Sequence, residues 1–233
     1  MTLATHPKLT ALPQQRLILP RSMTWEQFKA LDSLLEYTRS VRLSYLDGYV
    51  EIMTLSPEHG TIKYLIAGML CQFFLEKDIS FRPTGSATLQ GETKGSSKEP
   101  DLSYYFGEDR RQRETPDLAI EVVFTSGTIN KLEYYRRFNV AEVWFWEDGV
   151  FSIYQLNSEG YDRVSRSMLL PDLDLELLGR CLQMSEEKEA LKVFRDAVRV
   201  GQLRRYTNKI LPSNAGNGGN IRNVRNVIKI AMA

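Results

Sequence analysis

Residues 117–124 constrain the fold more than any other part of the chain, because they place one carboxylate inside an apolar, strand-like run. Side chains alternate between the two faces of a strand, so Glu121 shares its face with Ala119 and Val123. An isolated ionised carboxylate is costly to bury, so Glu121 needs a proton, a cationic partner or a metal ion. The sequence therefore predicts a buried strand with a functional acid near its centre.

A second carboxylate, Asp101, opens the preceding predicted strand. Both strands begin with a Pro-Asp pair, at Pro100 and at Pro116, and the connecting loop allows antiparallel or nearly antiparallel pairing. Asp101 and Glu121 can then converge, and two carboxylates with water are the oxygen ligands that a hard divalent ion such as Mg²⁺ prefers. The alternative is that Asp101 caps a turn while Glu121 pairs with an arginine such as Arg136.

A lysine follows on the next predicted helix, residues 130–138. Lys131, Tyr135 and Phe138 recur at spacings of four and three residues, so they share one helix face that packs on a sheet. This face places a cation close to the carboxylate pair. The alternative is a lysine whose aliphatic stem lies along the sheet edge with its ammonium in water.

Periodicity and turn residues indicate the rest of the fold. Apolar and polar residues alternate on both sides of Asp47-Gly48 and Asp148-Gly149, a dipeptide typical of hairpin turns. We expect a long helix over residues 56–76, a strand over residues 79–89 and a polar, mobile loop over residues 91–98. The element order predicts an α/β (α+β) fold, with a mixed central sheet flanked by helices, an N-terminal β-hairpin and a C-terminal helix.

The length of 233 residues suits one domain with tails rather than two domains. We expect a loose N-terminal arm at residues 1–21 and the folded domain at residues 22–182. A charged helix with one apolar face is expected at residues 183–211. Residues 212–233 are rich in Asn and Gly and bury too little to fold, so they are expected to form a disordered tail.

Composition bounds the protein's surroundings. Thirty basic and twenty-nine acidic residues leave a formal charge of +1, so no global positive field indicates a polyanionic partner. No apolar run is long enough to cross a bilayer, so we expect no membrane association. Cys71 and Cys181 lie far apart in apolar stretches, and the N-terminus lacks a secretory signal pattern. These features favour core thiols in a reducing cytoplasm.

The same residues resemble a known family. The combined pattern resembles the Uma-type family of putative restriction endonucleases, a branch of the PD-(D/E)XK nuclease superfamily. It consists of Pro100-Asp101 and of residues 117–123, 131–137 and 142–146, with Trp25-Glu26, Asp47-Gly48 and Ser56-Pro57-Glu58-His59 upstream and residues 170–174 downstream. The resemblance covers roughly residues 23–178 and implies a restriction-endonuclease-like sheet flanked by helices.

One position departs from the superfamily pattern. The usual lysine, two residues beyond the second acid, falls at Val123, whereas in Uma-type members a helix lysine takes this role and matches Lys131. The resemblance implies catalytic residues Asp101, Glu121 and Lys131 in a metal-dependent endonuclease that hydrolyses DNA phosphodiester bonds. Asp101, Glu121 and the carbonyl of Val122 would hold one or two Mg²⁺ (or Mn²⁺) ions, and Lys131 would orient water or stabilise charge on the phosphate.

Other residues are candidates for supporting roles. Glu58 could add a further metal ligand or contact the ligands from outside, although acids in a first helical turn usually act as electrostatic caps. His59 is either a neighbour of the site or a partly buried surface histidine. Four basic residues are candidate contacts to DNA phosphates: Lys94, Lys98, Arg136 and Arg137. The basic loop at residues 109–113 is a further candidate, and solvated surface is the alternative for this loop and for all four residues.

Two functional classes remain open at this stage. The first is the endonuclease, which the intact acid pair and lysine favour. The second is a catalytically silent nucleic-acid-binding or regulatory module on the same fold, because a fold does not establish activity; the near-zero net charge favours this class. The aromatic hairpin at residues 144–154 either supports a homodimer or is ordinary core.

Overall fold

The computed structural model describes residues 14–20, 22–38, 40–108, 113–124 and 130–210. The chain forms two compact units, Met1–Arg195 and Asp196–Ala233. Both sheets and helices α1 to α4 lie in the first unit, and helix α5, Glu187–Ile210, crosses the boundary. The expected tail at residues 212–233 and most of the expected arm lie outside the described residues.

The first sheet has five antiparallel strands in the order β1-β3-β2-β6-β5. Its strands are β1 (Arg16–Leu19), β2 (Val41–Leu46), β3 (Tyr49–Thr54), β5 (Leu89–Gly91) and β6 (Ser96–Lys98). The predicted β2–β3 hairpin is confirmed, and Asp47 and Gly48 adopt the positive φ angles that its tight turn requires. Helix α1, Trp25–Leu35, packs on one face of this sheet through Phe28.

Two sequence expectations for this sheet were wrong. Residues 16–19 were assigned to a loose arm, but they form β1, which pairs with β3. Residues 91–98 were expected to be a mobile loop, but they close a hairpin in which β6 pairs with both β5 and β2. Both strands are short and have little local pattern, so partners distant in the sequence determine their conformation.

The second sheet has six strands in the order β11-β10-β9-β8-β7-β4. Its strands are β4 (Phe81–Pro83), β7 (Leu102–Phe106), β8 (Leu118–Val122), β9 (Glu142–Glu147), β10 (Val150–Leu156) and β11 (Tyr161–Val164). Strands β8 and β9 are parallel, and every other pair is antiparallel, so the sheet is mixed as predicted. The strand expected at residues 79–89 is confined to β4 and the start of β5.

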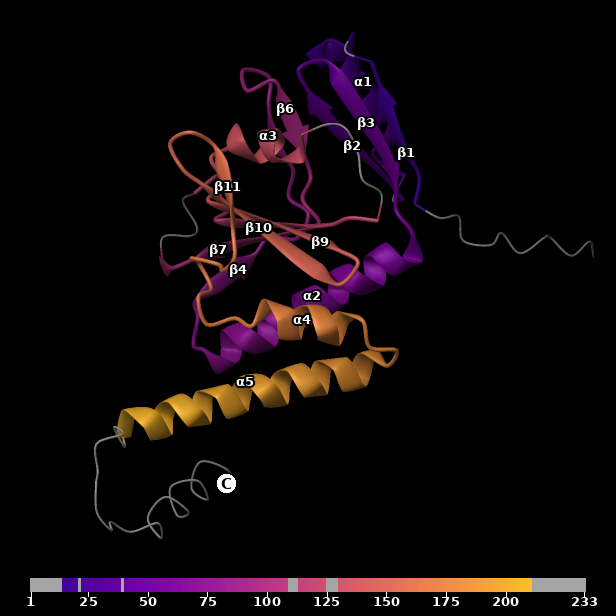
Figure 1. Ribbon diagram of the computed structural model, residues 1–233. Helices are drawn as coiled ribbons and strands as arrows, with labels where there is room; N and C mark the ends of the chain where they lie inside the picture. The colour runs from indigo at the N-terminus through magenta and orange to yellow at the C-terminus, as the bar shows by residue number, and fades with distance from the viewer. Residues whose placement is uncertain (1–13, 21, 39, 109–112, 125–129, 211–233) are drawn as a thin grey trace, which may run out of the picture. The chain divides into compact units, whose positions relative to one another are not determined.

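Helices cover the second sheet on both faces (Figure 1). Helix α2, Pro57–Glu76, begins at the Ser56 cap and packs its buried residues against β7 and β8, next to α4, Leu175–Leu182. The ring of Phe74 on α2 meets Tyr104 and Phe106 edge-on. The short helix α3, Lys131–Arg136, lies on the other face, beside β6 of the first sheet.

A buried polar layer lies where the first sheet meets α3 and the second sheet. Glu51 is opposite Ser44 in the β2–β3 ladder, and Lys98 follows Ser97, which is opposite Tyr45. Because side chains alternate along strands, Glu51, Ser44 and Lys98 share the face that points away from Tyr45 and α1. All three are buried, so the fold places charged groups between its two sheets.

Helix α4 approaches the β9–β10 turn so closely that one glycine is required. A Cβ added at Gly179 would lie 2.2 Å from the backbone oxygen of Gly149. We expect Gly179→Ala to lower the free energy of unfolding by about 1–3 kcal/mol, because the clash outweighs the better helix propensity of alanine. Gly60→Ala, where an added Cβ meets nothing within 4 Å, is expected to be neutral or stabilising. Urea unfolding of both variants measures the difference, and equal stabilities would contradict this packing.

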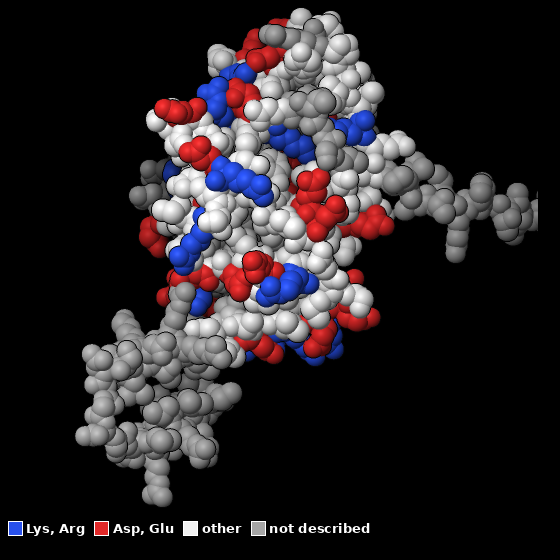
Figure 2. Space-filling model, in the orientation of Figure 1, with Lys and Arg blue, Asp and Glu red and all other residues white. Residues whose placement is uncertain are grey.

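The surface carries charges of both signs. Figure 2 shows acidic and basic side chains interspersed over one face, in keeping with the formal charge of +1. Cys181 is buried as expected, but Cys71 is exposed, so the expectation of two core thiols was wrong for Cys71. Within the described residues, no helix combines the length and the apolar character needed to cross a membrane.

Candidate active site

Asp101 and Glu121 lie next to each other on antiparallel neighbours. Asp101 directly precedes β7, and the register that places Leu102 opposite Ile120 brings Asp101 opposite Glu121 on the same sheet face. Only 3% of Asp101 and 1% of Glu121 is exposed to solvent. The backbone N–H of Val122 donates to Oδ2 of Asp101 at 2.8 Å, which ties the first acid to the strand that carries the second.

The carboxylate of Asp101 is held by two donors. Nε2 of His59 lies 3.1 Å from the same Oδ2, and it donates because a carboxylate oxygen only accepts. Burial alone would raise the pKa of Asp101, but His59, the Val122 N–H and the ammonium of Lys98 together hold it below its usual value. His59 reaches this position because the Ser56 hydroxyl caps α2 and fixes its first turn. The structure therefore places His59 against the candidate site.

Lys98 contacts Glu121. Its Nζ lies 3.2 Å from Oε1 of Glu121, and the hydroxyl of Tyr135 donates to the same oxygen. Burial alone would lower the pKa of Lys98, but the carboxylates of Glu121, Glu51 and Asp101 raise it above its ordinary value. Only 3% of Lys98 is exposed. The expectation that Lys98 lies in a polar loop was therefore wrong, because β6 buries it beside Glu121. Its contact with a DNA phosphate stays a prediction.

Glu51 is a third buried acid that sequence reasoning missed. Arg16 on β1 holds it with two bonds, from Nε to Oε1 at 2.6 Å and from Nη2 to Oε2 at 3.0 Å. Burial alone would raise the pKa of Glu51, but Lys98, Arg16 and Lys131 lower it. The signal was present in the sequence, because Glu51 stands between Val50 and Ile52 in a strand, just as Glu121 stands among apolar neighbours.

Lys131 is the first residue of α3 and is half-buried. Within the described part of the chain, its ammonium has no hydrogen bond or ion pair. The pKa of Lys131 lies below its ordinary value, mainly because the side chain is buried. The charges of Glu121 and Glu51 raise this pKa, whereas those of Lys98 and Arg16 lower it further. Two lysines thus lie near Glu121. Lys98 is in contact and strongly held as a cation, and Lys131 is nearby and releases its proton more easily.

The remaining predicted contacts lie elsewhere. Glu58 is exposed in the first turn of α2, where an acid favours the helix dipole, as in the alternative given for it above. Arg136 pairs with Glu133 on the surface of α3, so the alternative pairing of Arg136 with Glu121 was wrong. Arg113 pairs with Asp117, and residues 109–112 lie outside the described residues.

Arg137 and Lys94 connect α3 to two turns of the first sheet. The guanidinium of Arg137 binds Asp47 in the β2–β3 turn and the carbonyl of Lys94 at 2.7 Å. Lys94 in turn donates to the carbonyl of Arg137 at 2.7 Å and lies over the ring of Phe138. Both residues thus take part in surface contacts that tie α3 to the first sheet, and their contact with DNA phosphates stays a prediction.

The donor set of the site fits a small divalent ion. The contacts described above engage Oδ2 of Asp101 and Oε1 of Glu121, so each carboxylate keeps a second oxygen outside them. The buried hydroxyl of Tyr134 has no hydrogen-bond partner among the described residues, which leaves bonding capacity for water in the same layer. No group of three His, Cys, Asp or Glu residues that could hold a metal is found in the described ranges. Two carboxylates and several waters match the way proteins usually bind Mg²⁺.

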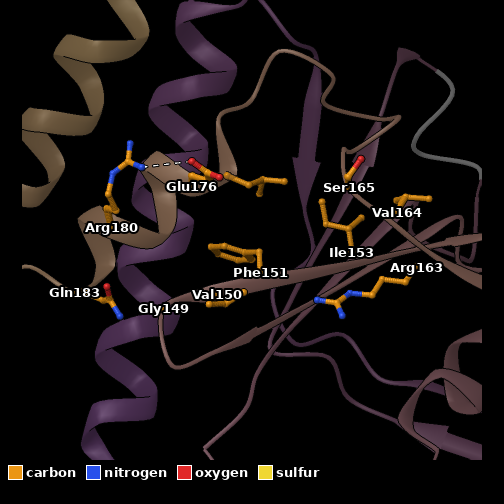
Figure 3. A pocket seen from close by; sticks show the side chains of 11 residues that line it. Gly149, Val150, Phe151, Ile153, Arg163, Val164, Ser165, Glu176, Arg180 and Gln183 are labelled. Atoms are coloured by element: carbon orange, nitrogen blue, oxygen red, sulfur yellow. Dashed lines mark ion pairs between the residues drawn. The ribbon is translucent and has the colours of Figure 1, made fainter.

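A cavity of about 700 Å³ lies apart from these carboxylates, between β10, β11 and α4 (Figure 3). Cross-strand partners share a sheet face, and Glu121 is opposite Phe145, which is opposite Ser152 on β10. The cavity residues Phe151 and Ile153 flank Ser152 along β10, so they point to the face away from Glu121. One carboxylate, Glu176, is among the described residues that line it, and it pairs with Arg180 at 3.6 Å. The paired acids therefore define the candidate active site, and this cavity does not.

The family model of Uma2, described as putative restriction endonuclease, matches residues 25–185. The chain belongs to the Uma2 family. No match is found among curated proteins. The match contains both acids and both lysines, and the mixed sheet with flanking helices is the restriction-endonuclease-like fold that the resemblance implied. Membership in Uma2 supports a nuclease at the level of the family.

Proposed function

We propose that this Uma2 protein is a divalent-metal-dependent endonuclease that hydrolyses phosphodiester bonds in DNA. The observation that carries the proposal is the buried pair of Asp101 and Glu121, set opposite each other on antiparallel strands with lysines beside them. Each of these buried carboxylates keeps one oxygen outside the contacts described above. Packing alone explains such a pair poorly, because burying two carboxylates costs free energy that burying two apolar side chains does not.

Asp101, Glu121 and the carbonyl of Val122 would hold Mg²⁺ or Mn²⁺. When bound, such an ion polarises a phosphoryl oxygen and lowers the pKa of a bound water. Hydrolysis joins the water oxygen to phosphorus, breaks one P–O ester bond and moves a proton from the water to the leaving oxygen. The chain's own residues set the geometry for this reaction: His59 and the Val122 N–H orient Asp101, and Tyr135 and Lys98 orient Glu121.

The two lysines have different roles in this proposal. Lys98 remains a cation because three carboxylates surround it, so it balances the negative charge of the two acids and holds Glu121 in place. Lys131 has a lowered pKa and no bond to a described residue, so its Nζ can take the water proton or supply one to the leaving oxygen. The helix lysine implied by the family resemblance therefore keeps its role in the proposal.

A catalytically silent module is the second candidate. Lys98 already neutralises Glu121, and the described residues do not include a cluster of three metal ligands. A protein that only binds nucleic acid could keep this arrangement without turnover. The two candidates make opposite predictions for cleavage in the presence of metal.

Nicking of supercoiled plasmid tests the proposal. We expect the purified full chain to nick DNA with Mg²⁺ or Mn²⁺ and to stop when EDTA is added. Glu121→Gln keeps the shape of the side chain and is expected to slow nicking by about tenfold or more, because a metal-binding oxygen is lost. Glu176→Gln, at the far cavity, serves as a matched control with unchanged activity. No nicking by folded wild type across these metals would favour the silent module, and equal rates for wild type and Glu121→Gln would exclude Glu121 from the reaction.

A further inference from the structure

Two cations that no prediction named meet beside Asp101. Arg42 extends from β2, and Lys63 lies on α2 four residues after His59, so Lys63 and His59 share one helix face. Nζ of Lys63 donates to the hydroxyl of Ser86 at 2.7 Å, and Nη2 of Arg42 donates to the same oxygen at 3.4 Å. The Ser86 hydroxyl donates in turn to the backbone carbonyl of Asp101 at 3.4 Å.

These two cations are only partly neutralised. Arg42 pairs with Glu99, whereas no carboxylate within ion-pair distance of Lys63 occurs in the part of the chain that the structure describes. Burial lowers the pKa of Lys63, the charge of Asp101 raises it, and the charge of Arg42 lowers it further. The guanidinium of Arg42 and the ammonium of Lys63 both donate to one neutral hydroxyl, and their positive charges repel each other. An anion placed between them would therefore be stabilised.

The position also remains open to a ligand. The side chain of Arg42 is 21% exposed, and Lys63 and Ser86 are half-buried. The three side chains come from β2, from α2 and from the turn after β4, so the scaffold holds them in place without a ligand. Burial of this degree strengthens a charge-assisted hydrogen bond while leaving one side accessible.

We propose that Arg42, Lys63 and Ser86 form a phosphate-binding site that holds the backbone of a nucleic acid next to Asp101. The inference rests on the proposed nuclease function, and it adds the direction from which the substrate approaches: over β2 and the start of α2, on the Asp101 side of the acid pair. A guanidinium and an ammonium that converge at one point are the usual protein partners of a phosphate. They also offset the repulsion between a phosphodiester and the carboxylates of Asp101 and Glu121.

Binding measurements without cleavage test the site. A fluorescein-labelled DNA duplex is titrated with protein in EDTA, and anisotropy gives Kd at several salt concentrations. We expect Arg42→Gln and Lys63→Gln each to weaken binding by roughly three- to tenfold at 0.1 M salt and to reduce the slope of log Kd against log salt by about 1. Lys63→Arg should keep most of the affinity. Arg163→Gln, which removes an exposed charge on β11, serves as the matched control with little change.

The outcomes separate this inference from the proposed function. If wild type binds and nicks DNA but both glutamine variants keep its Kd and salt slope, the phosphate site is wrong and the nuclease proposal stands. If wild type binds no DNA, a thermal-shift measurement decides, with inorganic phosphate compared against chloride at equal ionic strength. Phosphate that stabilises wild type but neither variant would support the anion site without DNA, and equal shifts in all three proteins would overturn it.

Discussion

Lys131→Met is expected to slow plasmid nicking by about 10²- to 10⁴-fold while leaving the free energy of unfolding unchanged or higher. The loss of activity follows from the proposed role of Nζ in proton transfer. The retained stability follows from the surroundings, because burial works against the protonated form of Lys131 and no described residue forms an ion pair with it. Methionine keeps an unbranched, apolar stem of similar length and removes the ammonium group.

The dependence on pH provides a second measurement of the same variant. The pKa of Lys131 in the folded state lies below its ordinary 10.5. Above the folded pKa and up to 10.5, only the unfolded state still carries the proton, so wild-type stability rises with pH in that window. Lys131→Met should lack this rise. If Lys131 accepts the water proton, wild-type nicking should also rise as the pH approaches the folded pKa.

Two comparison variants sharpen the result. Lys131→Arg keeps a permanent positive charge and cannot act as a base, so it separates proton transfer from simple charge stabilisation. Lys192→Met, on an exposed part of α5, controls for loss of a surface lysine. Nicking by Lys131→Met at the wild-type rate would exclude Lys131 from the reaction, and a large loss of stability would mean that its ammonium has a structural partner.

The acid pair could be predicted from the sequence because its signals are local. A carboxylate in an apolar strand, Pro-Asp at a strand start and Asp-Gly in a turn each depend on only a few neighbouring residues. The two strands that these patterns indicated are adjacent in the structure, with Asp101 opposite Glu121. The Ser56 cap likewise fixed the start of α2 and hence the position of His59. For these elements, propensity and tertiary packing favour the same conformation.

The cations around the acids could not be predicted in the same way. Ser96, Ser97 and Lys98 are polar and have no strand pattern of their own, and they form β6 only because β2 supplies hydrogen-bond partners about fifty residues earlier in the chain. Arg42, Lys63 and Ser86 likewise come from three elements that meet only in the folded molecule. Glu51 was the exception, because the reasoning applied to Glu121 would have found it.

Lys98→Met is expected to lower the free energy of unfolding by about 3–5 kcal/mol, because it leaves Glu121 and Glu51 without the buried cation between them. The folded-state pKa of Lys98 is raised above its ordinary 10.5. Its contribution is therefore fully present below pH 10.5 and is lost as the pH rises through the folded pKa. The difference from wild type should be largest near neutral pH and should shrink in strong alkali. Urea unfolding at both pH values measures it.

The double variant Lys98→Met/Glu121→Gln keeps this prediction testable if Lys98→Met does not fold. Removing both charges takes away the unpaired carboxylate, so the double variant should be more stable than Lys98→Met alone, with a coupling of about 0.5–3 kcal/mol. Glu51 retains Arg16 in both proteins, which confines the comparison to the Lys98–Glu121 pair. A Lys98→Met protein as stable as wild type would contradict a structural role for this lysine. If that stable variant also failed to nick DNA, Lys98 rather than Lys131 would be the lysine that takes part in the reaction.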